Sequence, residues 1–177
     1  GQTFDPAGFR LPGDVIPASE TGNPFSDPEI NHTKAPLYQK KPIPDLFRLT
    51  DAADDDKTVF YVKLSEAQIM QYCRDYDSTP NVIMSVLLVK AARRLDPECK
   101  KTITVSVCVN RKAMLGNFNN YRMFTGEAIL DFSNERDLED LTKTCTIARG
   151  QLMLQVQPEN ILWELKQMKR MLPPPSP

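Results

Sequence analysis

The sequence predicts a mixed α/β fold in which helices pack on a sheet. Three observations support this prediction. Apolar residues recur at steps of three and four in several segments, other segments are rich in β-branched residues, and 41% of the 177 residues are apolar. A chain of this length can bury one hydrophobic core, because domains commonly have about 100–200 residues. The predicted order is an extended arm followed by β, α, α, β, β, α, α, which makes a two-layer arrangement with a mixed sheet.

The proline distribution divides the chain into three parts. Residues 1–57 hold eight of the fifteen prolines. Each proline removes a backbone donor and fixes φ, so we predict an extended, mostly irregular arm. Apolar residues such as Phe4, Phe25 and Phe47 favour an arm that packs over a surface, and a disordered leader is the alternative. Residues 58–172 should form the folded α/β unit, and residues 173–177 are a proline-rich tail.

The folded unit should begin with a strand over residues 58–64 (TVFYVKL). A helix over 66–75 follows, because Ser65 and Gln68 form a capping box. A second helix should run over 80–95, with proline at its first position. Its apolar residues occur on almost every side, so we expect it to be buried against the sheet with Leu87 in the core.

Two more strands and two more helices complete the prediction. Residues 102–109 and 122–132 are the strands, and 110–121 is the loop between them. Residues 133–137 should cap a helix that carries apolar residues from Leu138 to Leu152, and Pro158 should begin the last helix. Two amphipathic helices in succession favour an antiparallel pair.

Charge and cysteine spacing argue against several classes of protein. The chain has 22 basic and 23 acidic residues and a formal net charge of −1, so it lacks the basic stripe that nucleic-acid binding needs. No apolar run approaches the ~20 residues that span a bilayer, and we expect a soluble, cytoplasmic protein. The four cysteines are far apart, which favours thiols in a reducing compartment. With one histidine, no zinc site can be assembled, so we predict no metal ligand.

The loop over 110–121 is the strongest candidate for a functional surface. Its polar residues are Asn110, Arg111, Gly116, Asn117, Asn119 and Asn120. Asparagine and glycine tolerate left-handed backbone angles, so a purely conformational loop and a binding loop are both open interpretations. A serine or cysteine nucleophile needs an oriented base, and the single histidine, His32, lies in the arm. We therefore predict that this chain carries no catalytic residue.

One resemblance gives the sequence a functional hypothesis. Between Tyr61 and Phe132 the motifs LSEAQ, STPNVIMSVLLVKAARRL, TVSVCVNRKAML and NNYRMF follow one another. This segment resembles the C-terminal half of chloramphenicol-acetyltransferase-like acyltransferases, the superfamily of condensation domains and alcohol acetyltransferases. The arm sequence GDVIPASETGNPFSDPEI is similar to the stretch that links the two halves in some bacterial members. In order of elements, the resemblance covers residues 10–170.

The resemblance implies half of a CoA-dependent acyltransferase-like fold that forms one wall of a substrate tunnel. In the family, the histidine of an HHxxxDG motif takes a proton from the hydroxyl or amine that attacks a thioester. That motif is absent here and is expected upstream in a full-length member. Asn110 and Arg111 match a family pair at a strand end, where the arginine supports the active-site loop, and Asn117 and Asn119 lie in the same loop. The implied substrate of the parent protein is a coenzyme A thioester, with no tightly bound cofactor.

Two other hypotheses remain: a non-catalytic protein-interaction module built on the same half-fold, and an unrelated α/β binding domain. An HHxxxDG motif upstream in the parent gene would favour the enzyme, because fold alone does not settle function. The expected partner is the missing N-terminal half or a second copy of this chain. Half of a layered fold leaves a sheet edge and an apolar face uncovered, so we expect self-association, with strand 58–64 or an exchanged arm at the interface.

Overall fold

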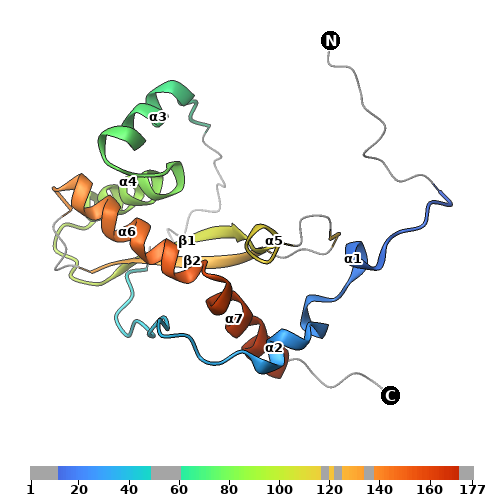
Figure 1. The fold of residues 1–177 in the computed structure, drawn as a ribbon. Helices are drawn as coiled ribbons and strands as arrows, with labels where there is room; N and C mark the ends of the chain where they lie inside the picture. Colours follow the sequence, from blue (N-terminus) through green and yellow to red (C-terminus); the bar gives the residue numbers. More distant parts are fainter. Residues whose placement is uncertain (1–11, 49–60, 117–119, 122–124, 134–137, 172–177) are drawn as a thin grey trace, which may run out of the picture.

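The computed structural model describes residues 12–48, 61–116, 120–121, 125–133 and 138–171. In this part of the chain the fold is mixed α/β, with a two-stranded antiparallel sheet and seven α-helices (Figure 1). Across the same residues, we find no helix with the length and apolarity that a membrane crossing requires.

The sheet is a single antiparallel hairpin. β1 (Ile103–Asn110) pairs with β2 (Thr125–Phe132), from Ile103 opposite Phe132 to Asn110 opposite Thr125. Alternate residues of β2, from Gly126 to Phe132, are buried, as expected for a strand with one covered face. The two predicted strands at the loop 110–121 are therefore confirmed, and the loop itself begins with a short helix, α5 (Arg111–Met114).

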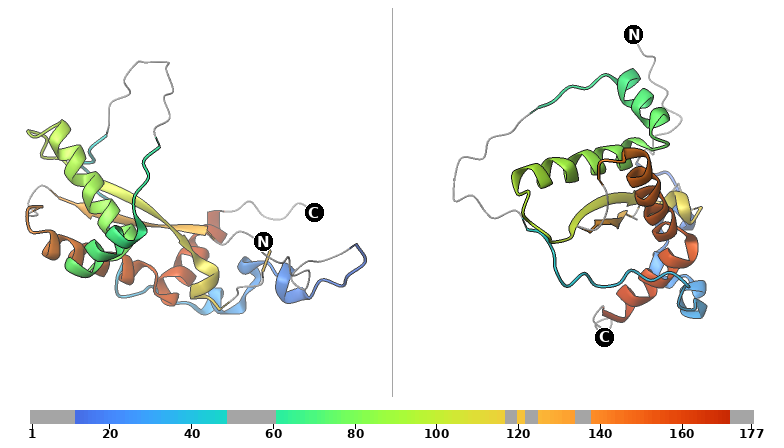
Figure 2. Two further views of the ribbon diagram at one scale, coloured as in Figure 1. Left: turned by 90° about the horizontal axis from the view of Figure 1, so that it is seen from above. Right: turned by 90° about the vertical axis from the view of Figure 1, so that its left-hand side faces the viewer.

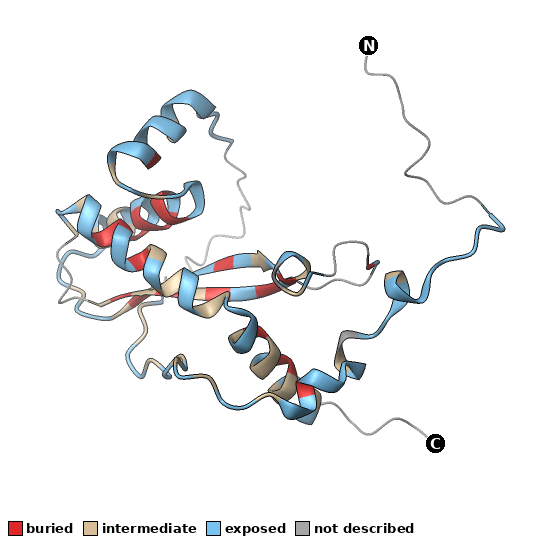
Figure 3. Ribbon diagram, in the orientation of Figure 1, coloured by how far each residue is buried: buried red, intermediate tan, exposed pale blue. Residues whose placement is uncertain are grey.

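Two helices pack on the hairpin, and a third packs on one of them. α4 (Pro80–Leu95) packs on β1, α6 (Leu141–Gln155) packs on β2, and α3 (Glu66–Asp75) packs on α4 (Figure 2). The buried residues gather along the hairpin and on the helices above it (Figure 3), and they form the main core: Val82, Ile83, Val86, Val89, Ile103, Val107, Leu130, Phe132, Cys73, Cys145 and Ala148. The predicted helices over 66–75 and 80–95 are confirmed. Ser65 caps α3 by accepting from the Gln68 N–H, as the capping box predicts.

The arm and the last helix form a second, smaller core. The arm contains α1 (Ala18–Thr21), the 3₁₀ helix η2 (Pro24–Ser26) and α2 (Pro28–His32). Ile30 of α2 is fully buried against Ile161 and Leu165 of α7 (Pro158–Met171). The arm then runs past the hairpin, where Leu46 makes an isolated parallel bridge to Thr102.

The strand predicted over residues 58–64 is wrong where it can be checked. Residues 61–64 form no strand, and Tyr61 and Val62 are 90% and 78% exposed. Residues 58–60 lie outside the described part. β-branched and aromatic residues form a strand only where they pair with another strand, and residues 61–64 pair with neither β1 nor β2. The sheet is consequently antiparallel with one parallel bridge, and not the mixed sheet that we predicted.

Three details of the helices also differ from the predictions. The outer side of α4 is uncovered, and Leu87 is 43% exposed, because the sheet, α3 and α6 pack on the other side. α6 begins at Leu141 with Asp140 as its cap, whereas residues 134–137 of the predicted cap lie outside the described part. α7 leads from the end of α6 towards α2 and does not fold back along α6 (Figure 1), since its apolar side is covered by the arm.

We expect two neighbours on α4 to respond differently to truncation. Ile83→Ala should lower the free energy of unfolding by about 2–5 kcal/mol, because it leaves a cavity in the main core. Leu87→Ala should cost less than about 1 kcal/mol, because its side chain is already partly in water. Urea unfolding followed by circular dichroism measures both. Equal losses would show that α4 is covered on both sides in solution.

Candidate functional site

A cavity of about 600 Å³ lies between the arm, β2 and α7. Its apolar lining comes from Tyr38, Ile129, Trp163 and Met168, and its polar lining includes Arg111 and Gln167. Cavities of about 300–1,000 Å³ with apolar walls and a few polar groups commonly accept small molecules. This cavity is therefore the candidate site.

Arg111 is fixed by contacts that lie far from it in the sequence. It is buried, and its guanidinium forms an ion pair with Glu164 of α7. The guanidinium also lies against Gly126 of β2, where an added Cβ would be only 1.9–2.3 Å from its atoms. The Arg111 guanidinium thus occupies the space that a side chain at position 126 would fill, and glycine leaves this space free. Before it, Asn110 caps α5 by accepting from the Lys112 N–H at 3.1 Å.

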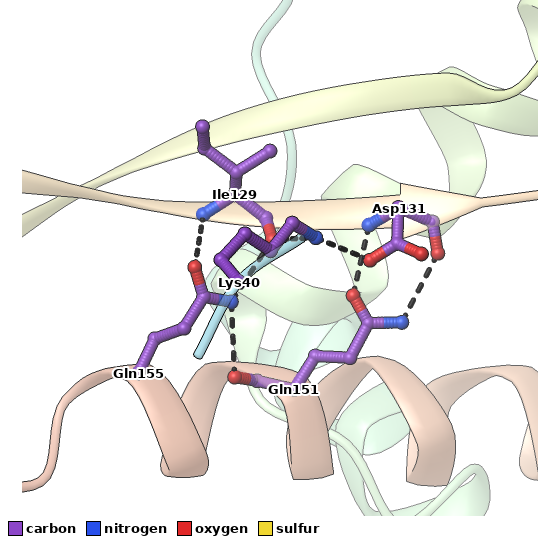
Figure 4. Close-up of polar contacts among 5 residues, drawn as sticks. All are labelled: Lys40, Ile129, Asp131, Gln151 and Gln155. Carbon is purple, nitrogen blue, oxygen red and sulfur yellow. Dashed lines mark hydrogen bonds and ion pairs between the residues drawn. The ribbon is translucent and has the colours of Figure 1, made fainter. Parts of the chain in front are cut away.

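Two glutamines of α6 hydrogen-bond the outer edge of β2 as a neighbouring strand would (Figure 4). The Gln155 side chain accepts from the Ile129 N–H and donates to the Ile129 carbonyl, both at 2.9 Å. Gln151 does the same at Asp131, at 2.8 and 3.0 Å. Gln151 and Gln155, which are one helical turn apart on α6, thus match Asp131 and Ile129, which are two residues apart on β2. At Ile129 and Asp131 the edge of β2 is thus satisfied without another strand.

Lys40 fastens the arm to this edge (Figure 4). Its ammonium donates to the Ile129 carbonyl at 3.0 Å and forms an ion pair with Asp131. The adjacent Tyr38 also lines the cavity. Burial raises the pKa of the Tyr38 hydroxyl, and the nearby charge of Asp131 raises it further. The hydroxyl therefore stays protonated at neutral pH.

The α7 wall combines an aromatic ring with amide groups. Trp163 is the single tryptophan of the chain, and the Lys166 ammonium lies 5.7 Å from its ring centroid. Lys166 also donates to the Asn31 and Thr33 carbonyls at 2.8 and 2.7 Å, which holds the end of α2. The Nε2 of Gln167 is buried and has no hydrogen-bond partner among the described residues. A ligand acceptor in the cavity would satisfy this donor once the Gln167 amide turns towards it.

The structure separates the residues that the sequence singled out. Arg111 lines the cavity, Asn110 caps α5, and Asn117 and Asn119 lie outside the described residues. Asn120 is buried and holds the arm, since its amide donates to the Ser19 and Gly22 carbonyls at 3.2 and 2.9 Å. Lys40, Trp163 and Gln167 were missed, because nothing in their local patterns brings the arm and α7 together.

The histidine and the cysteines do not contribute to the cavity. His32 is exposed at the end of α2 and is not part of the lining. Cys73 and Cys145 are buried in the main core, where burial raises the pKa of the Cys145 thiol. All four cysteines are free thiols. Within the described ranges, no group of three or more histidine, cysteine or acidic residues is placed to hold a metal ion.

We expect Gly126→Ala to act through Arg111. The new methyl group would displace the guanidinium from Glu164, so the loss of stability should be on the order of 1–3 kcal/mol, limited by the exposure of Glu164. Arg111→Met removes the same contact. Urea unfolding of both single variants and the double variant should give strongly non-additive losses. Additive losses would show that Gly126 does not act through the arginine.

Comparisons of this chain with protein-family models, with curated proteins and with solved structures found no match.

Proposed function

We propose that this chain is the substrate-binding half of an acyltransferase-like protein. In this proposal, the cavity holds the uncharged part of an acyl thioester. The observation that carries it is that both cations of the cavity, Lys40 and Arg111, are paired with carboxylates, whereas the buried amide nitrogen of Gln167 has no hydrogen-bond partner among the described residues. The resemblance to the acyltransferase superfamily supplies the class of substrate.

The charges of the cavity favour a neutral ligand. Its two cations, Lys40 and Arg111, are already paired with Asp131 and Glu164. The exposed carboxylate of Glu127 also lines the cavity. A phosphate group would therefore gain no unpaired cation and would meet a negative charge. Of the two ends of a coenzyme A thioester, the nucleotide end carries phosphates and is therefore disfavoured in the cavity. The pantetheine arm with its acyl group is favoured, because its amides and thioester are uncharged.

The walls of the cavity suit the shape and chemistry of such an arm. The side chains of Ile129, Trp163 and Met168 offer apolar contacts for methylene groups. The Gln167 amide donates to a carbonyl oxygen. A hydrogen bond formed with a buried, unsatisfied donor discriminates strongly for ligands that carry an acceptor. The described lining holds neither histidine nor cysteine, so the proposal assigns the base to the HHxxxDG motif of the family.

The alternative function, a protein-interaction module, is favoured by a different observation. The outer side of α4 carries exposed leucines that no described element covers. This surface is separate from the cavity, so both functions can belong to one chain.

Trp163 provides a direct test of ligand binding, because its fluorescence reports on the cavity alone. We expect S-acetylpantetheine to change this fluorescence in a saturable manner and adenosine 3′,5′-bisphosphate to leave it unchanged. Gln167→Leu should weaken binding about three- to tenfold, the worth of one hydrogen bond. Gln71→Leu, on the exposed surface of α3, is the matched control. Saturable binding of the nucleotide alone, or no binding of the thioester, would contradict the proposal.

A second expectation concerns catalysis. The described residues of this chain should not transfer acyl groups from acetyl-coenzyme A, because no oriented base lies at the cavity. After the chain's own thiols have reacted with a chromogenic disulfide, the steady rate of thiol release should equal the rate without protein. Release above that rate that is lost in His32→Ala would show that the arm histidine is a catalytic base.

A further inference from the structure

A second cavity adjoins the candidate site at the corner between α6 and α7. It has a volume of about 560 Å³, with the arm on one side and that corner on the other. Lys34 and Glu159 lie in its lining, are both exposed and add one charge of each sign. Most of the lining surface is apolar and comes from Ala35, Pro36, Leu37, Leu154 and Leu162. The space therefore suits an apolar group.

The two cavities meet at two residues. Tyr38 of the arm and Asn160 in the first turn of α7 line both of them. The Asn160 side chain is held in place, because its amide donates to the Leu154 carbonyl at 2.7 Å. A phenol and an amide are both uncharged. The junction therefore presents no charge to a ligand that extends from one cavity into the other.

The candidate site has a charged end and an apolar end. At the charged end, Arg111 lies against Gly126 and pairs with Glu164. At the other end, Ile129 is bonded to Gln155, which is the last residue of α6. The residue before Gln155 already lines the second cavity. The apolar end of the candidate site thus adjoins the second cavity.

Helix α7 sets the distance from the amide donor to the junction. Asn160 and Gln167 lie seven residues apart on one face of the helix, which is about 10 Å at ~1.5 Å per residue. An extended chain of single bonds advances about 1.2 Å per bond, because the three backbone bonds of a residue span at most about 3.6 Å. A chain of about eight bonds therefore connects an acceptor at Gln167 with the junction at Asn160.

We propose that the second cavity holds the tail of a hydrocarbon acyl chain, so that the substrate class is a medium- or long-chain acyl thioester rather than an acetyl thioester. This inference rests on the proposed function, because it places the thioester group in the candidate site. The thioester carbonyl accepts from the Gln167 amide, and the chain runs along α7 past Trp163 and Asn160. Carbons beyond about the eighth then lie among the leucines of the second cavity.

A chain-length series measured by Trp163 fluorescence is the first test. The probes are S-acetylpantetheine, S-hexanoylpantetheine and S-dodecanoylpantetheine, each below the concentration at which it forms micelles. We expect the dodecanoyl thioester to bind at least tenfold more tightly than the hexanoyl thioester, because several of its methylene groups leave water beyond the junction. Equal affinities of these two would overturn the inference and leave the proposed function standing. A failure of all three to bind would overturn both.

Two consecutive residues of α6 give a matched pair of variants. Leu154 lines the second cavity and Met153 does not, although their side chains are similarly exposed, at 46% and 54%. Leu154→Glu should weaken binding of the dodecanoyl thioester at least tenfold more than binding of the acetyl thioester, since the carboxylate meets only the tail. Met153→Glu should change neither affinity. Equal losses in the two variants, or equal losses for the two thioesters, would show that the tail lies elsewhere.

The arm provides an independent pair of variants. Leu37 lines the second cavity and is fully exposed, whereas Val15 of the arm is 87% exposed and lies outside both linings. Leu37→Asp should reduce the gain in affinity from hexanoyl to dodecanoyl, because a tail between the arm and the corner contacts both walls. Val15→Asp should preserve that gain. A gain that survives Leu37→Asp unchanged would show that the tail does not lie beneath the arm.

Circular dichroism verifies that these four variants keep the fold. None of the four side chains belongs to either hydrophobic core, so we expect unchanged spectra.

Discussion

The hairpin depends on two glutamine side chains that take the place of a strand. Gln151 and Gln155 satisfy the N–H and C=O groups of Asp131 and Ile129 and connect α6 to the outer edge of β2. A two-stranded hairpin alone is only marginally stable in water, so its persistence requires a covered face and satisfied edges. α4 and α6 cover the apolar face of the hairpin, and the two glutamines satisfy the backbone groups of Ile129 and Asp131 at one edge.

That edge also organises the cavity. The Ile129 carbonyl accepts two hydrogen bonds, one from the Gln155 amide and one from the Lys40 ammonium. The second bond attaches the arm to the hairpin. The arm is fixed at its other end by Ile30 against α7 and by Lys166 at the end of α2. The cavity is therefore lined by segments that are far apart in the sequence, and the arm and α7 are separated by more than a hundred residues. Its two cations, Lys40 and Arg111, are paired with Asp131 and Glu164, so the lining offers apolar groups and the carboxylate of Glu127 but no unpaired cation among the described residues.

The opposite edge has the reverse character. β1 is held to the arm at Thr102, and among the described residues the outward backbone groups of Thr104, Ser106 and Cys108 have no partner. A helix that is apolar on all sides is normally covered on all sides. The edge of β2 that the glutamines hold thus borders the candidate binding site.

By itself, the sequence determined the features that depend on neighbouring residues. α3 and α4 occur where the Ser65 cap and the proline at position 80, the first of its helix, predict them, and the two strands flank the predicted loop, since helix bonds and turn preferences are local. Arg111 was singled out from the same loop. Tertiary structure alone decided that residues 61–64 have no strand to pair with and that Leu87 faces outward. It also brought Glu164, Trp163 and Gln167 to Arg111, because the free energy of those contacts comes from packing between distant segments, which no local pattern encodes.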